Sequence, residues 1–116
     1  MDPSRCLFCK IVRKEIPARL ALETELVLAF HDVNPQAPTH VLVIPKAHLA
    51  GLEALPEADP GLHSALLLAV QKVARQEGLV AGGYRTVVNT GEHAGQSVPH
   101  LHFHVLGGRA LGWPPG

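Results

Sequence analysis

Three histidines stand at alternate positions near the end of the printed sequence: His100, His102 and His104. In a β-strand, alternate side chains point to the same face, so these imidazoles share one face and the apolar residues between them share the other. Such a row suits metal binding, since neighbouring imidazoles can converge on one zinc ion. It equally suits catalysis by a histidine nucleophile or base that its neighbours tune. A polar, solvent-facing edge strand is the third explanation, and the strict alternation favours function over it.

The loop before the histidines, Gly95-Gln96-Ser97, supplies exposed backbone N–H groups and two polar side chains. A loop of this kind can hold phosphate oxygens without any net positive charge. An ordinary Gly/Ser turn has the same composition, so the interpretation depends on the histidine row that follows. Together, the loop and the row favour phosphate chemistry.

A second chemical feature is the pair Cys6 and Cys9, whose two-residue spacing occurs in zinc sites and in redox dithiols. The redox interpretation is disfavoured, because no segment typical of a thioredoxin-like strand precedes the pair. Two free thiols remain the alternative to a zinc site.

Local patterns predict the elements that must position these residues. Residues 26–30, 41–44, 84–89 and 100–106 are typical of strands. Residues 9–15 predict a short helix that ends before Pro17. Asp59 and Pro60 predict the N-cap and first residue of a long helix, whose apolar residues recur at helical spacing until Gly78. This order predicts an α+β domain with a mainly antiparallel sheet.

Composition narrows the class of protein. A chain of 116 residues with 47% hydrophobic content fits one domain over residues 1–116. Ten Lys and Arg balance ten Asp and Glu, which disfavours a nucleic-acid binder because such proteins carry a basic excess. No apolar stretch approaches the roughly 20 residues that span a bilayer, and the N-terminal residues do not resemble a signal peptide. We therefore expect a cytoplasmic protein that binds neither nucleic acid nor membranes.

The segment QSVPHLHFHVL at residues 96–106 resembles the His-x-His-x-His motif that defines the histidine-triad (HIT) superfamily. Three further segments resemble its Hint branch: IVRKEIPA at 11–18, AFHDVNPQAPTHVLVIPKAH at 29–48 and GGRALGWPPG at 107–116. The resemblance implies a HIT-like fold, in which a mainly antiparallel five-stranded sheet carries one long and one short helix. It also implies a symmetric homodimer.

The resemblance implies a nucleotide-binding hydrolase of purine nucleoside 5′-phosphoramidates, such as AMP linked to an amine, with aminoacyl-adenylates as further substrates. His102 corresponds to the histidine that attacks the α-phosphorus and forms a nucleotidyl-histidine intermediate. Three other catalytic positions contact the phosphate, support the nucleophile and assist the leaving group, and they correspond in turn to His104, His40 and Ser97. The implied reaction uses no catalytic cofactor.

The positions that would bind the nucleotide are spread along the chain. Asp32 corresponds to the acid that accepts hydrogen bonds from the ribose hydroxyls. The base pocket would be lined by two aromatic side chains and an apolar wall: Phe30 and His31, with Ile11 or Ile16. The phosphate site would combine an amide, the loop and the third histidine of the row: Asn89, Gly95, Gln96, Ser97 and His104. Trp113, in the C-terminal tail, would reach toward the partner's site in the dimer.

Bacterial relatives that carry the cysteine pair imply a structural zinc ion. Its four ligands would be Cys6, Cys9, His48 and His100. Two thiolates and two imidazoles form a closed tetrahedral site, which is structural rather than catalytic.

Three other functions remain open at this point. A dinucleoside polyphosphate hydrolase is the alternative within the superfamily. A nucleotide-binding regulator with incidental turnover is a second, and a metal-binding module that uses the triad itself as ligands is a third.

Overall fold

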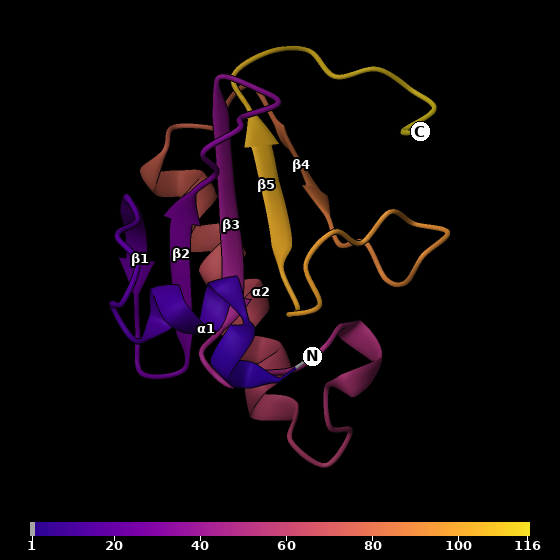
Figure 1. Ribbon diagram of the computed structural model, residues 1–116. Coiled ribbons are helices and arrows are strands. Elements are labelled where there is room, and N and C mark those ends of the chain that lie inside the picture. Colours follow the sequence, from indigo (N-terminus) through magenta and orange to yellow (C-terminus); the bar gives the residue numbers. More distant parts are fainter. Residues whose placement is uncertain (1) are drawn as a thin grey trace.

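The computed structural model describes residues 2–116, and its centre is an antiparallel five-stranded sheet with strand order β1-β2-β3-β5-β4 (Figure 1). The strands are β1 (Leu20–Glu23), β2 (Val27–His31), β3 (Thr39–Pro45), β4 (Tyr84–Val87) and β5 (Phe103–Gly107). The α-helices are α1 (Leu7–Val12) and α2 (Pro60–Gln76), and short 3₁₀ turns occupy Pro3–Arg5 and Leu52–Ala54. The predicted α+β architecture, a mainly antiparallel five-stranded sheet with one long and one short helix, is confirmed.

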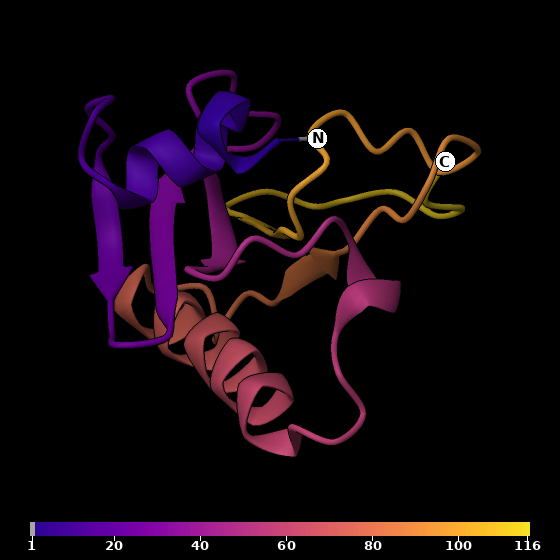
Figure 2. The ribbon, with the colours of Figure 1, turned by 60° about the horizontal axis from the view of Figure 1, so that its bottom comes forward.

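The two helices cover opposite faces of the sheet (Figure 2). The long helix α2 packs its buried stripe, which includes Leu66 and Val73, against one face. The short helix α1 places Phe8 and Ile11 on the other face, against Phe30 of β2 and Ile44 of β3. Because β2 and β3 are covered on both faces, their residues are buried almost without interruption.

Helix α2 begins and ends where the sequence predicts. The Asp59 carboxylate accepts from the backbone N–H of Leu62 (3.4 Å), and Pro60 takes the first helical position. Gly78, just beyond the helix, has φ +72°, a conformation that favours glycine and stops the helix.

Helix α1 differs from its predicted range of 9–15. It starts earlier because Cys6 caps it: the Cys6 sulfur accepts from the backbone N–H of Cys9 at 3.4 Å. It also ends earlier, since Lys14 adopts a positive φ of 63°, which a right-handed helix cannot contain.

Strands β4 and β5 are shorter at one end than predicted. β5 starts at Phe103 rather than at His100, and Val43 is its last partner on β3 in that direction. Beyond that point Pro45 has no N–H to donate, and its carbonyl accepts from the imidazole Nε2 of His100 (2.9 Å). The alternation of faces nevertheless continues through this segment, because Leu101 lies in the same core as Phe103 and Val105.

Residue patterns do not predict β1, which enters the expected fold only through the family resemblance. It is a half-exposed edge strand with the sequence LALE, in which apolar and polar residues do not alternate. Its pairing register with β2 is also irregular between Leu20 and Leu22. Within residues 2–116, none of the helices has the length and apolar character needed to cross a membrane.

Candidate active site and metal-binding cluster

The histidine row lies inside the protein. β5 is flanked by β3 and β4, and His100 and His102 are 0% and 4% exposed, so an exposed polar face does not explain the row. The Phe8 ring of α1 packs edge-on against both imidazoles, with ring centroids 5.8 Å from His100 and 5.2 Å from His102. The row therefore lies between the sheet and α1, on the face opposite α2.

The orientation of His102 is set by its own backbone neighbourhood. Its Nδ1 lies 2.8 Å from the carbonyl oxygen of His100. Because a carbonyl only accepts hydrogen bonds, Nδ1 carries the proton and donates it. In the neutral ring, the other nitrogen, Nε2, then has the lone pair that a nucleophile or base requires.

His40 and His104 form a second oriented unit. The backbone N–H of Gln36 donates to His40 Nδ1 (3.0 Å), so His40 carries its proton on Nε2. His40 Nε2–H donates in turn to His104 Nδ1 at 2.8 Å, and the neutral His104 keeps its proton on Nε2. His104 thus offers a donor beside the His102 ring, whose centroid is 5.0 Å away. The sequence contains no signal for the Gln36 contact, because a backbone group makes it.

Burial keeps these histidines neutral. It lowers the pKa of His104 to about 4, with the neighbouring His102 and His40 acting in the same direction. Burial also lowers the pKa of His40, although the Asp32 carboxylate, 3.5 Å away, opposes the shift. Near neutral pH, the unit therefore presents a hydrogen-bond donor rather than a fixed positive charge.

The predicted nucleotide-binding residues at the end of β2 lie on two different faces of the sheet. Phe30 lies with Phe8 and Ile11 on the α1 face, and Asp32 approaches His40 on the same side. His31 points the other way, and its Nε2 lies 4.0 Å from a carboxylate oxygen of Glu77, which follows α2. His31 is therefore not brought together with the base-pocket residues, as the two-residue period of a strand requires.

Both of the predicted apolar wall residues, Ile11 and Ile16, line a cavity of about 160 Å³ on the α1 side. Lys14, Pro17, Ala18 and Leu20 complete its lining. Ile16 also packs against the cluster that contains Phe30. The structure therefore brings the two isoleucines together with Phe30, as an apolar site for a base would need.

The residues of the Gly95-Gln96-Ser97 loop differ in whether their polar groups already form hydrogen bonds. Gln96 is engaged, because its carboxamide donates to the carbonyls of Ala50 and Val98 and accepts from the Gly91 N–H. Its side chain thus closes the loop, which the composition of the loop did not predict. Ser97 is exposed, and Gly95 turns the chain with φ +76°. Asn89 lies two residues beyond β4 and is half-buried.

Trp113 lies apart from the other predicted site residues of its own chain. Its side chain is 83% exposed, on a C-terminal tail that extends away from the sheet (Figure 1). At the start of the tail, the Arg85 side chain of β4 donates a hydrogen bond to the Gly112 carbonyl (2.7 Å).

The four predicted metal ligands do come together. Their ligand atoms lie within 4.8 Å of one another: Cys6 Sγ, Cys9 Sγ, His48 Nδ1 and His100 Nδ1. The sulfur–nitrogen distances are 3.3 Å for Cys6–His100, 3.2 Å for Cys9–His48 and 3.5 Å for Cys9–His100. Bonds of about 2.3 Å to sulfur and 2.0 Å to nitrogen in a tetrahedron place such atoms about 3.5 Å apart. The cluster therefore fits a zinc ion.

Hydrogen bonds and burial prepare this cluster for a cation. His100 donates its Nε2–H to the Pro45 carbonyl, which leaves Nδ1 with a lone pair directed at the thiols. Burial, and then the adjacent Cys6 thiol, raise the pKa of Cys9 to about 11. The Cys9 thiol therefore stays protonated near neutral pH in the absence of a cation, so a metal that binds here must displace its proton.

A second group of metal-binding side chains, Asp32, His40 and His104, also lies within 4.8 Å. Here the two imidazole nitrogens are 2.8 Å apart and share a proton. Two nitrogens bound to one tetrahedral ion lie about 3.3 Å apart, so the shared proton fits this spacing better than an ion does. The contacts thus divide the row: the His100 imidazole bonds to the thiols, while His102 bonds to the His100 carbonyl and His104 bonds to His40.

An α+β domain with a buried, oriented histidine row and an adjacent Cys₂His₂ cluster defines the class of protein. The HIT domain model matches residues 13–111, and the chain belongs to this family. It is 56% identical over 110 residues to an uncharacterized HIT-like protein of Synechococcus elongatus, covering 95% of this chain and 96% of the relative. It is also 50% identical over 118 residues to a 14 kDa zinc-binding protein of Zea mays, and the match covers 100% of this chain and 91% of the relative.

Among solved structures, a HIT family hydrolase from Legionella pneumophila superposes with a TM-score of 0.93 at 48% identity. The superposition covers 97% of this chain and 100% of that one. Similarity of this extent shows that the arrangement of strands and helices is shared over nearly the whole length of both chains.

Proposed function

We propose that this protein is a nucleotide-binding hydrolase that cleaves purine nucleoside 5′-phosphoramidates through a covalent nucleotidyl-histidine intermediate. The observation that carries the proposal is the 2.8 Å hydrogen bond from His102 Nδ1–H to the His100 carbonyl. It leaves the Nε2 lone pair of a neutral imidazole as the available nucleophile. The similar Legionella protein is named a HIT family hydrolase, which supports hydrolysis as the reaction class.

In the first step, His102 Nε2 attacks the α-phosphorus, a phosphorus–nitrogen bond to the imidazole forms, and the bond to the substrate amine breaks. The departing nitrogen takes up a proton, and the exposed Ser97 hydroxyl would assist its departure. His104 donates its Nε2–H to a phosphoryl oxygen, where negative charge develops. Water then attacks the phosphorus, the bond to His102 breaks, and nucleoside monophosphate leaves. The sum is phosphoramidate plus water giving monophosphate plus amine.

Three groups on the α1 face would bind the nucleoside. Asp32 accepts from the Asn34 N–H with one carboxylate oxygen (2.9 Å), and the other oxygen, 3.5 Å from His40 Nε2, would also accept from a ribose hydroxyl. Phe30, with Ile11 and Ile16, offers an apolar surface for a flat base. His31 has no part in this proposal, because it lies on the other face of the sheet.

A structural zinc ion is the second part of the proposal. Cys6, Cys9, His48 and His100 would hold it, and it would supply a fixed cross-link between α1 and the sheet without a role in bond cleavage. The name of the Zea mays relative, a zinc-binding protein, supports this assignment.

Two further expectations belong to the proposal. A symmetric homodimer would cover the exposed Trp113 tail and bring it to the partner's site. Work in the cytoplasm suits two buried free cysteines, because a reducing compartment keeps thiols available for metal.

The test is turnover of a fluorogenic adenosine phosphoramidate by wild-type protein and by His102→Ala, with dinucleoside polyphosphates as competing substrates. We expect the His102 variant to lose at least about a thousandfold in rate while still binding AMP, since removal of a nucleophile affects the covalent route. His93→Ala, at an exposed histidine, is the matched control and should keep its rate. Preferential cleavage of dinucleoside polyphosphates would move the assignment to the alternative hydrolase branch. A His102 variant that keeps a tenth of the activity would exclude the mechanism.

A further inference from the structure

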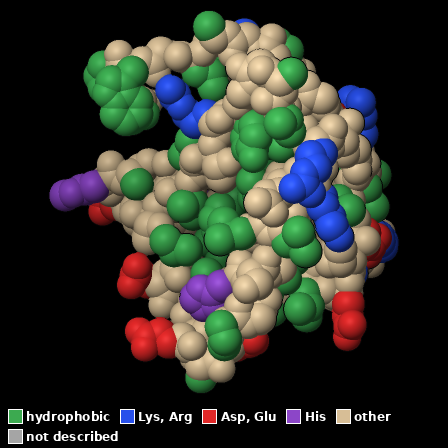
Figure 3. All heavy atoms as spheres, turned by 180° about the vertical axis from the view of Figure 1, so that it is seen from behind, with side chains coloured by type: hydrophobic (Ala, Val, Ile, Leu, Met, Phe, Trp, Pro, Cys, Tyr) green, Lys and Arg blue, Asp and Glu red, His purple; other side chains and the backbone are tan. Residues whose placement is uncertain are grey.

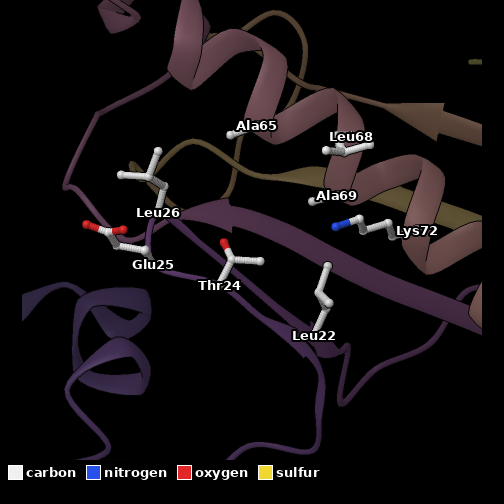
Figure 4. Close-up of a pocket in the computed structure, with 8 residues that line it drawn as sticks. All are labelled: Leu22, Thr24, Glu25, Leu26, Ala65, Leu68, Ala69 and Lys72. Carbon is white, nitrogen blue, oxygen red and sulfur yellow. The ribbon is translucent and has the colours of Figure 1, made fainter.

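A cavity of about 260 Å³ lies between α2 and the β1–β2 hairpin, on the face of the sheet opposite the histidines (Figure 4). Its lining comes from the hairpin and from one side of the helix: Leu22, Thr24, Glu25 and Leu26, with Ala65, Leu68, Ala69 and Lys72. None of these residues has a role in the proposed hydrolysis. A ligand in this cavity would therefore bind whether or not the protein catalyses that reaction.

The walls of the cavity are apolar and face water. Leu26 and Leu68, on either side of the opening, are 48% and 46% exposed. Ala65 and Ala69 stand one helical turn apart on α2, and their small side chains leave the space that larger residues would fill. Figure 3 shows this side of the molecule, with apolar side chains gathered in its middle and charged ones around them.

One cation is directed into this apolar space. In Figure 4 the Lys72 side chain bends back along α2, so that its ammonium group points toward the cavity between Ala69 and Leu22. Among the described residues, no carboxylate lies within 4.0 Å of this ammonium. Glu25, at the opposite end, turns its carboxylate away from the cavity (Figure 4).

The remaining polar group is already satisfied. The Thr24 hydroxyl accepts from the Val27 N–H (3.1 Å) and lies 3.4 Å from the Val27 carbonyl oxygen, closing the hairpin. A ligand in the cavity would thus meet an apolar channel with a positive charge at one end and a negative charge near the other. This polarity selects an anionic head group for the Lys72 end.

We propose that the cavity binds a short aliphatic monocarboxylate, with its carboxylate on Lys72 and its chain between Leu22, Leu26 and Leu68. The volume is slightly below the roughly 300 Å³ at which ordinary ligand pockets begin, so it suits a chain of about six to eight carbons rather than a larger molecule. The aliphatic chain covers exposed leucine surface, and the carboxylate pairs with an ammonium that has no carboxylate within 4.0 Å among residues 2–116.

The experiment is a titration of isotopically labelled full-length protein with hexanoate, heptanoate and octanoate, followed by NMR chemical shifts. Hexanol and hexylamine are the neutral and cationic comparison ligands. We expect saturable shifts at the residues that line the cavity, and tightening of up to about fourfold for each added methylene. Hexylamine should bind more weakly than hexanol, because its charge repels Lys72.

Variants separate the charge from the apolar space. Lys72→Gln should weaken hexanoate binding by about two- to fivefold and leave hexanol binding unchanged. Arg75→Gln, a cation on the same helix that does not line the cavity, is the matched control. Ala65→Phe should fill the cavity and remove binding of both ligands. Ala65→Met provides a smaller filling if the phenylalanine variant does not fold.

Several results would overturn the proposal. Shifts that do not saturate, equal binding of hexanoate and hexylamine, or unchanged binding after Ala65→Met and Ala65→Phe would each exclude a carboxylate site. Shifts at the cavity that follow protein concentration rather than ligand would instead show that a second copy of the chain covers this face.

Discussion

The two faces of the sheet are held in different ways. The α2 face is a continuous apolar core in which a 17-residue helix packs through a stripe of buried side chains. The α1 face is covered by a six-residue helix, and its buried groups include thiols and imidazoles that hydrogen-bond to one another and to backbone carbonyls. A helix this short has little stability of its own. The fold therefore depends mainly on the α2 face, whereas the proposed chemistry depends on polar contacts across the α1 face.

The largest expected effect on stability comes from a cavity on the α2 face. Leu66 is 1% exposed, so Leu66→Ala should lower the free energy of unfolding by about 2–5 kcal/mol. Urea unfolding measures the change, and Leu67→Ala, at the adjacent and exposed position, should stay within about 0.5 kcal/mol. Metal content and turnover of the folded Leu66 variant should match wild type. Loss of metal in that variant would show that the faces are not independent.

Removal of the proposed zinc ion is expected to have the next largest effect on stability, and to act on the α1 face. An ion that binds only the folded chain, present at about 100 times its Kd, adds about 2.7 kcal/mol. A chelator should therefore lower the Tm of wild-type protein and leave the Tm of Cys6→Ser unchanged. Cys6→Ser should lower the Tm more than it lowers the chemical rate, since the cluster is proposed to be structural.

Elemental analysis of protein purified without chelator is the companion measurement. One zinc per chain in wild type and a clear loss in Cys6→Ser are expected. Protein without zinc, or with zinc retained by Cys6→Ser, would contradict the assignment of the cluster.

The buried histidines should make stability depend on pH. The pKa of His104 is about 4 in the folded protein and about 6.5 when unfolded, so the unfolded chain binds more protons between these values. The stability that neutral His104 contributes is present above about pH 6.5 and is lost as the pH falls toward 4. The free energy of unfolding should thus fall more between pH 7.5 and 5 for wild type than for His104→Gln. Equal losses would exclude this role, because protonation of the metal ligands affects both proteins alike.

The smallest expected effect on stability comes from the tail. Deleting residues 113–116 removes an exposed tryptophan and should change the free energy of unfolding by no more than about 0.5 kcal/mol. It should instead change the preference among phosphoramidates with bulky amines, if the tail reaches a partner's site. Unchanged preference, or a monomeric wild-type protein by light scattering, would count against the tail and the dimer together.

Much of the fold followed from local patterns. Asp59, Pro60 and Gly78 mark the ends of α2 because capping and positive φ are decided by the residue itself. The alternation of imidazoles and apolar residues was also predicted correctly, although β5 begins only at Phe103. The strand starts late because Pro45, on the neighbouring strand, lacks an N–H. A pattern within one segment cannot contain that information.

Less of the candidate site than of the fold could be predicted from local residue patterns. The approach of Cys6 and Cys9 to His48 and His100 depends on contacts between distant segments, and only the family resemblance implied it. The position of His31 could have been corrected from the sequence, since neighbours on a strand face opposite sides. The hydrogen bonds from Gln96 to Ala50 and Val98 could not be predicted, because both partners are backbone carbonyls placed by the fold.

The proposed covalent intermediate on His102 can be detected by mass spectrometry of intact protein, acid-quenched within milliseconds of mixing with an adenosine phosphoramidate. Wild-type protein should carry one added adenylyl group, and peptide mapping should place it on His102. His102→Ala should carry none, while His104→Gln should form the adduct more slowly. An adduct on another residue, or steady turnover by wild-type protein with no adduct at any quench time, would contradict the account.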